Sequence, residues 1–542
     1  MKLDIKLHSS LEKIFPDQLH AEDSLNDVEL FQNETASFQV SWRVVSGESR
    51  DFIEWEIDSP IADHIRARRV RNVPVGFACM EDADEDYLRR TPGVYPDLLS
   101  EVGLNRLYGF AAQRCCLWLD VEPEGIAPGE YPVTIRMGRE QDEKDERTLT
   151  VRVLKGMLPR QELVYTRWFY CDCICEAYKV EMGSERFWQL AEAFLAIAVK
   201  RGMNAVLTPI HTPPLDTAVG HERMTTQLVK IQKCGSEYKF DFADLDRWIE
   251  MAKRAGTEYF EMAHLFTQWG AKAAPKIVAE VDGEVRRIFG WETPSDSPEY
   301  AGFLAQYLTA LTAHLRKLGI AEKCWFHISD EPRAEMLEDY NKAKATVAPY
   351  LEGFPIRDAL SDLEFYRQGV VKTPIVATNH IDPFLEAQVE GLWCYYCVGQ
   401  YKETSNCFIA MPGQRTRMIG LQMYLHDIRG FLQWGYNFYH NQYSYDVIDP
   451  YLITDGDGFA PAGDAFIVYP GENGPEESMR MMHTAQALQD LRALKYLEQL
   501  KGRAFVEELI GETITFRAYP RDLHWLEDMR RRVNAAICEA GK

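Results

Sequence analysis

The sequence has no long apolar run among its 542 residues. Nowhere does it reach about 18 uninterrupted apolar residues, the length that a transmembrane helix requires. The opening segment, MKLDIKLHSSLEKIFPDQ, places charges between its apolar residues before the hydrophobic stretch of a signal peptide could form. We therefore predict that the protein neither spans a membrane nor is secreted, and we expect it in the cytoplasm.

Basic residues are few relative to acidic ones. The chain has 60 Lys and Arg against 83 Asp and Glu, which gives a formal net charge of -23. Binding to nucleic acid requires a concentrated basic surface that neutralises phosphates and releases counterions, and an anionic membrane attracts the same kind of surface. The composition therefore argues against nucleic acid and membrane partners.

The 12 cysteines lack the spacing of a complete metal site. Cys171, Cys173 and Cys175 alternate along a segment that we interpret as a strand, and Cys394 and Cys397 form a C-x-x-C pair. A composite thiolate site is conceivable, but structural zinc sites usually pair two close elements of this kind or add histidines. Reduced cysteines buried in the core are the stronger interpretation, so we predict no metal and no cofactor.

The pattern of apolar residues divides the chain into three parts. Alternating apolar positions at 38–44, 131–137 and 149–153 are typical of strands with one buried face, and they predict an N-terminal β-sandwich over residues 1–158. Residues 476–542 read as helical, with 479–500 as the clearest helix, and we expect them to pack on the central part.

The central part, residues 159–475, alternates short apolar runs with amphipathic helices. Helices are expected after the N-cap residues Ser184 and Ser297. Eight segments are strand candidates: 163–170, 204–210, 258–266, 324–329, 353–359, 373–379, 391–397 and 430–438. Eight parallel strands predict an α/β fold with a (β/α)8 TIM-type barrel.

An acidic pair stands where one predicted barrel strand ends. The apolar segment 324–329 runs directly into Asp330 and Glu331, and Pro332 then stops the strand. Active sites of such barrels lie at the carboxyl ends of the strands. Two neighbouring carboxyls with different pKa values can supply a proton donor and a stabilising charge, as the cleavage of a glycosidic bond requires. Alternatively, Asp330 caps the next helix and Glu331 lies on its solvated first turn.

The motif HISDEP at 327–332 resembles the strand end of glycoside hydrolase family 123 and of the related uncharacterised barrel proteins that share its catalytic domain. Further motifs are similar to this family in the same order: WFYCD at 168–172, WGYN at 434–437, FIVYPG at 466–471 and SMR at 478–480. The N-terminal β-sandwich is similar too, so the resemblance spans nearly the whole chain.

The resemblance implies a retaining, exo-acting β-N-acetylgalactosaminidase, in which the 2-acetamido group of the substrate serves as the nucleophile. By position, Glu331 would be the general acid/base. Asp330 would orient the acetamido N–H and stabilise the oxazolinium-like intermediate. The expected partner is a small oligosaccharide or glycoconjugate.

Other strand ends supply candidate substrate-binding residues, because aromatic faces can stack on sugar rings and polar groups can bind hydroxyls. These candidates are Trp168, Tyr170, Asp172, His211, Trp269, His327, Asn379, His380, Tyr395, Trp434, Tyr436 and Asn437. The segment 212–216 is expected to form a wall of the pocket.

The sequence leaves two alternative functions open. The first is a glycosidase with its own carboxylate nucleophile, Asp172 or Asp358, acting on a sugar without an acetamido group. The second is a carbohydrate-binding protein that kept the barrel without catalysis, since fold does not fix function.

Overall fold

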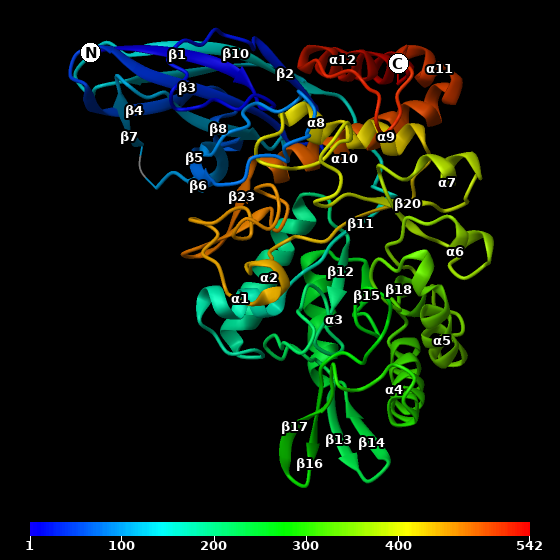
Figure 1. The fold of residues 1–542 in the computed structure, drawn as a ribbon. Helices are drawn as coiled ribbons and strands as arrows, with labels where there is room; N and C mark the ends of the chain where they lie inside the picture. Colours follow the sequence, from blue (N-terminus) through cyan, green and yellow to red (C-terminus); the bar gives the residue numbers. More distant parts are fainter. Residues whose placement is uncertain (104, 542) are drawn as a thin grey trace.

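The computed structural model describes residues 1–103 and 105–541 and shows a mixed α/β fold with an N-terminal β-rich region (Figure 1). One N-terminal sheet contains, in spatial order, β1 (Lys2–Ser9), β3 (Ala36–Ser46), β8 (Cys115–Val121), β5 (Ile65–Val75), β6 (Gly93–Glu101), β23 (Gly474–Ser478) and β22 (Val468–Gly471). The other contains β2 (Asp27–Phe31), β10 (Asp145–Leu154), β9 (Gly129–Gly138), β4 (Arg50–Asp58) and β7 (Arg106–Phe110).

The alternation seen in the sequence is what forms the core between these two sheets. In β9, Val133, Ile135 and Met137 are fully buried, whereas Thr134 and Arg136 between them are half-buried. Both sheets contribute side chains of this kind to one hydrophobic cluster. The strands predicted at 38–44, 131–137 and 149–153 are confirmed.

A seven-stranded parallel sheet carries the central part of the chain. Its strands, in spatial order, are β18 (Cys324–Trp325), β15 (Tyr259–Met262), β12 (Ala205–Thr208), β11 (Val164–Arg167), β21 (Gly430–Gln433), β20 (Trp393–Tyr395) and β19 (Ile375–Ala377). All seven lie within segments that the sequence predicted as barrel strands.

The eighth predicted strand, 353–359, is not a strand. It makes single parallel bridges to both edges of the sheet, from Ile356 to Phe326 and from Ala359 to Ile375. Continuous pairing is interrupted because the Ile328 N–H donates to the carboxylate of Asp358 (3.0 Å) instead of to a backbone carbonyl. A continuous eight-stranded barrel is therefore not what the structure shows.

Helices flank this sheet, and two of them, α2 (Glu185–Lys200) and α4 (Pro298–Lys317), begin directly after the serines that the sequence indicated as N-caps. The Oγ atoms of Ser184 and Ser297 accept hydrogen bonds from the N–H groups of Phe187 and Tyr300, both at 3.2 Å. The helices are α1 (Cys171–Tyr178), α2 (Glu185–Lys200), α3 (Ala243–Ala255), α4 (Pro298–Lys317), α5 (Leu337–Val347), α6 (Glu364–Arg367), α7 (Asp382–Glu386), α8 (Gly413–Arg417) and α9 (Ile419–Leu425).

The strand predicted for the cysteine-rich segment is wrong, because Cys171, Cys173 and Cys175 lie on the helix α1. Cys171 and Cys175 are four residues apart, so on a helix they share a face, and both belong to the same hydrophobic cluster. Cys173 belongs to a second cluster. The apparent alternation was therefore one helix with buried residues on two sides.

A four-stranded sheet projects from the end of the central sheet, at the bottom of Figure 1. It consists of β14 (Glu237–Asp241), β13 (Lys230–Cys234), β16 (Ile277–Val281) and β17 (Glu284–Phe289).

Among the described residues, no helix is both long and apolar enough to cross a bilayer.

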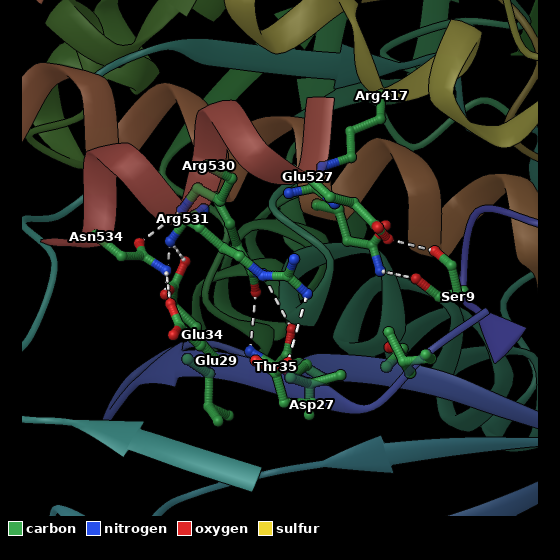
Figure 2. A pocket seen from close by; sticks show the side chains of 18 residues that line it. Ser9, Asp27, Glu29, Glu34, Thr35, Arg417, Glu527, Arg530, Arg531 and Asn534 are labelled. Carbon is green, nitrogen blue, oxygen red and sulfur yellow. Dashed lines mark hydrogen bonds and ion pairs between the residues drawn. The ribbon is translucent and has the colours of Figure 1, made fainter. Parts of the chain in front are cut away.

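The C-terminal helices α10 (Met479–Lys501), α11 (Arg503–Ile510) and α12 (Leu523–Ala540) lie beside the N-terminal sheets (Figure 1). Figure 2 shows the polar pocket at this junction, where Arg530 of α12 points toward Glu34 and Asn534. Its guanidinium donates to both carboxylate oxygens of Glu34 (2.7 and 2.8 Å), to Asp490 (2.8 Å) and to Asn534 (2.9 Å). Removing one partner would leave a buried charge uncompensated, so this cluster fixes the helices against the sheet.

Candidate active site

An open cavity lies at the carboxyl ends of the central strands. Its empty space, counted together with the solvent at its mouth, is about 750 Å³. Its wall combines three acidic side chains, Asp216, Asp330 and Glu331, with a set of aromatic rings. The rings are those of Trp168, Tyr170, Trp269, Tyr395, Trp434, Tyr443 and Phe459. Aromatic walls with a few polar groups are typical of a site for a small molecule.

The backbone at Glu331 allows two neighbouring acids to share this cavity. Side chains of successive strand residues point to opposite faces, but Glu331 has a φ of 42°, in the left-handed region that non-glycine residues rarely adopt. The Glu331 N–H donates to the Ala359 carbonyl (3.1 Å), and the Asp330 carbonyl accepts from the Trp269 N–H (2.9 Å). These bonds hold a conformation that costs about 1 kcal/mol or more, as is common at functional sites.

The two acids differ in their surroundings. The Tyr395 hydroxyl donates to Oε1 of Glu331 at 2.6 Å. Burial, together with the neighbouring charge of Glu331, raises the pKa of Asp330 well above its usual range. Burial and the neighbouring negative charge therefore favour the protonated form of Asp330.

A buried cluster lies behind the cavity. Nε2 of His327 bonds to Glu261 (2.6 Å), and its Nδ1 bonds to Asp358 (3.2 Å). Burial alone would lower the pKa of His327, but hydrogen bonds to Asp358 and Glu261 and their charges raise it to about 9. Glu261 also accepts from Nε1 of Trp168 (2.9 Å) and from the Thr166 hydroxyl (2.6 Å), so the cluster holds one aromatic wall of the cavity in place.

Seven of the site residues predicted from the sequence are brought together in the cavity wall. They are Trp168, Tyr170, Trp269, Asp330, Glu331, Tyr395 and Trp434.

The other predicted residues lie outside the cavity wall. Asp172 is ion-paired with Arg223 (2.6 Å), and His211 bonds to the His264 carbonyl (2.8 Å), its pKa lowered to about 4 by burial. Asn379 bonds to Gln400 (2.7 Å).

Tyr436 and Asn437, which follow β21, are buried and lie outside the cavity wall. The Tyr436 hydroxyl donates to the Phe194 carbonyl (2.7 Å) among buried apolar side chains. Asn437 accepts from the Tyr170 N–H (2.9 Å) and donates to its carbonyl (3.0 Å), so it positions a residue that does line the cavity. His327 and Asp358 belong to the buried cluster described above, and His380 is exposed.

Several residues of the wall were not among the individual candidates for substrate binding. Asp216 comes from the loop that was expected to wall the pocket, and burial raises the pKa of its carboxyl to about 6. Its Oδ2 and the Tyr170 hydroxyl are buried, and no described residue forms a hydrogen bond with either. Tyr443 and Phe459 come from a long loop after β21, where no strand end pointed to them.

Two groups of side chains have the spacing of metal ligands: Asp172 with Cys173 and His440, and His264 with His327 and Asp358. In the first group the Arg223 guanidinium already neutralises Asp172. In the second, the protonated His327 lies between two carboxylates. A side-chain cation thus satisfies the acids in each group.

Trp434 is held by a buried acid. Its Nε1 donates to Oδ2 of Asp464 (2.9 Å), and burial raises the pKa of Asp464 to about 7, although this hydrogen bond opposes the rise. A carboxyl whose pKa is higher in the folded than in the unfolded state binds the proton more tightly when folded, so stability falls as pH rises between the two pKa values.

We predict a weaker pH dependence for Asp464→Asn, whose side-chain oxygen can still accept from Trp434. Between pH 5 and 7.5 the wild type should lose about 2 kcal/mol of unfolding free energy relative to the variant, because only the wild type must ionise a buried carboxyl. Denaturant unfolding at both pH values measures this difference. Parallel pH dependences of the two proteins would contradict it.

Comparisons with known proteins agree with this geometry. The family description "Glycoside hydrolase 123, catalytic domain" matches residues 168–497. A solved structure of a family 123 glycoside hydrolase from Clostridium perfringens, determined to explain glycolipid glycan hydrolysis, aligns with a TM-score of 0.78. The alignment covers 100% of this chain and 99% of that chain at 15% identity, which shows a similar fold.

Other similarities are weaker. A putative glycoside hydrolase from Bacteroides vulgatus aligns at 12% identity over 88% of this chain and 78% of that chain, with a TM-score of 0.33. A Bacteroides ovatus GH5 xyloglucanase aligns at 8% identity over 90% and 100%, with a TM-score of 0.31. Both scores are too low to indicate a shared overall fold. A search of curated proteins gave no significant match.

Proposed function

The chain belongs to glycoside hydrolase family 123, and from this premise we propose that it is a retaining exo-glycosidase that releases a terminal β-linked N-acetylhexosamine, preferentially N-acetylgalactosamine. The observation that carries the proposal is the placement of Asp330 and Glu331 in one aromatic cavity. Such a cavity can hold a sugar ring against aromatic faces while two carboxyls reach the same bond.

In this proposal Glu331 protonates the departing glycosidic oxygen and later deprotonates the attacking water. Asp330 accepts the N–H of the 2-acetamido group, whose carbonyl oxygen attacks the anomeric carbon. The negative charge of Asp330 then stabilises the oxazolinium-like intermediate. Tyr395 holds Glu331 by its 2.6 Å hydrogen bond.

In this proposal, substrate binding changes which of the two acids carries a proton, because the pKa of Asp330 is raised before the sugar binds. Before the sugar binds, burial and the charge of Glu331 favour the neutral form of Asp330. An acetamido N–H donated to Asp330 favours its ionised form. The proton then passes to Glu331, which becomes the acid only when the correct sugar is bound.

The C. perfringens relative was studied with glycolipid glycans. We extend this substrate class to the present chain as part of the proposal: a small oligosaccharide or the glycan of a glycoconjugate, with the terminal sugar in the cavity.

We also propose three structural units: a sandwich over 1–158, a (β/α)8 barrel over 159–475 and a helical segment over 476–542. The bridges of Ile356 and Ala359 to the two edges of the central sheet support a barrel in which this segment takes the eighth place.

A glycosidase with its own nucleophile is the second candidate, because Asp216 is a third carboxyl in the cavity. The earlier candidates for this role, Asp172 and Asp358, lie outside the cavity wall in ion pairs.

A panel of chromogenic glycosides, assayed with and without inhibitors, tests the proposal. We expect turnover of β-N-acetylgalactosaminides and inhibition by an N-acetylhexosamine thiazoline, which mimics the cyclic intermediate. Trapping of the enzyme by a fluorinated glycoside, with no effect of the thiazoline, would favour the second candidate. Absence of any turnover across the panel would favour a binding protein.

A further inference from the structure

Four aromatic rings form a row that begins in the cavity and ends on the surface. Trp269 and Tyr443 line the cavity, with ring centroids 5.6 Å apart and planes at 82°. Tyr445 follows, 6.4 Å from Tyr443, and His221 lies 5.5 Å beyond it. The row therefore continues the aromatic wall past the edge of the cavity.

The rings of this row meet solvent. Trp269 is 37% exposed and Tyr445 is 60% exposed. Leaving such large apolar faces in water forgoes the free energy that burial would provide. A row of exposed rings continuous with a binding cavity is typical of a surface that a ligand covers.

The backbone that carries these rings is strained. Trp269, Tyr443 and Ser444 all have positive φ angles, 58°, 63° and 59°, in the left-handed region. Hydrogen bonds fix them, since the Trp269 N–H donates to the Asp330 carbonyl (2.9 Å) and the Tyr443 carbonyl accepts from the Ala218 N–H (3.0 Å). The strained residues are thus tied to the acid pair on one side and to the neighbouring loop on the other.

We infer that this row binds the second sugar of the substrate, the one that carries the leaving oxygen. The inference rests on the proposed function: with the terminal sugar against Asp330 and Glu331, the rest of the chain must leave through the mouth of the cavity. There the exposed rings of Trp269 and Tyr445 can stack on the C–H faces of a pyranose. The ligand class is therefore an oligosaccharide of two or more sugars.

Binding measurements on the Glu331→Gln protein, whose turnover is expected to be strongly reduced, test this inference with little hydrolysis of the probe. The probes are N-acetylgalactosamine and a trisaccharide with N-acetylgalactosamine β-linked at its non-reducing end, both followed by calorimetry. We expect the trisaccharide to bind more tightly than the monosaccharide. A further Tyr445→Ala change should remove about 2- to 10-fold of the trisaccharide affinity and leave the monosaccharide affinity as it was.

Two control variants make the result specific. Tyr445→Phe keeps the ring and should keep the trisaccharide affinity. Phe505→Ala removes a ring of α11 that is 39% exposed and lies outside the row, and it should change neither affinity. Equal affinities for the two sugars, or an equal loss of both in Tyr445→Ala, would overturn the inference.

Failure of the proposed function would look different from failure of this inference. Wild-type protein that hydrolyses no N-acetylhexosaminide, but whose trisaccharide affinity depends on Tyr445, would refute hydrolysis and leave the sugar-binding row in place. Wild-type protein that hydrolyses the trisaccharide, with no contribution of Tyr445 to binding, would refute the row and leave hydrolysis in place.

Discussion

Glu331→Gln is expected to lower kcat by about 10²- to 10⁴-fold on a substrate with a sugar leaving group, because the amide cannot deliver a proton to the departing oxygen. The substitution preserves size and an oxygen that can accept from the Tyr395 hydroxyl, now 2.6 Å from Glu331. Steady-state kinetics with an oligosaccharide measures the loss. KM should change little, since the proton is transferred in the transition state.

The leaving group offers an internal control for this variant. A glycosyl fluoride or dinitrophenyl glycoside departs with little protonation, so the loss should be much smaller on these substrates. Azide needs no deprotonation and should restore part of the second step. Glu338→Gln, on the exposed face of α5, serves as a matched variant that should retain full activity. Activity of Glu331→Gln within tenfold of wild type on the oligosaccharide would remove Glu331 from the mechanism.

Asp330→Asn is expected to lower kcat by about 10²- to 10³-fold on acetamido substrates. The asparagine oxygen can still accept the acetamido N–H, but the charge that stabilises the oxazolinium-like intermediate is gone. Affinity for the thiazoline should fall with it, because a mimic of the intermediate depends on the same charge. Kinetics and thiazoline inhibition constants measured on both proteins test this.

The pH profile distinguishes this role from a structural one. In the wild type, burial and the charge of Glu331 raise the pKa of Asp330. In general, a negative charge beside an acid makes the loss of its proton less favourable. Without the charge at 330, the alkaline limb of the activity profile should move to lower pH. An unchanged profile with an equal loss on all substrates would indicate that the asparagine disturbs the fold.

The position of the acids was readable from the sequence because local patterns encode it. An apolar run that ends in Asp330, Glu331 and Pro332 is a strand end, and parallel strand ends meet at one edge of a sheet. The same logic found Trp168 and Trp434. It failed at Tyr436, because regular alternation stops where β21 ends at Gln433 and the side chain turns into the core.

Loop geometry could not be predicted in this way. The loop 212–216, which ends at Asp216, was expected in the pocket wall. Tyr443 and Phe459 were not, because they come from a long connection whose path depends on contacts with other loops, such as the Ser444 hydroxyl bound to the Asp216 carbonyl (2.7 Å). Hydrogen bonds between residues far apart in sequence have no local signature. The helix α1 was mistaken for a strand for a related reason, since both of its faces are buried and periodicity alone does not separate the two structures.

By itself, the sequence determined the seven strands of the central sheet, the helices capped by Ser184 and Ser297 and the acidic strand end, because hydrophobic period, N-caps and proline act within a few residues. Only the tertiary structure decided that Asp330 and Glu331 face the same cavity. That outcome depends on the left-handed backbone of Glu331, which the carbonyl of Ala359, 28 positions away, holds in place. The same long-range contacts assemble the aromatic row, since its rings come from three separate loops.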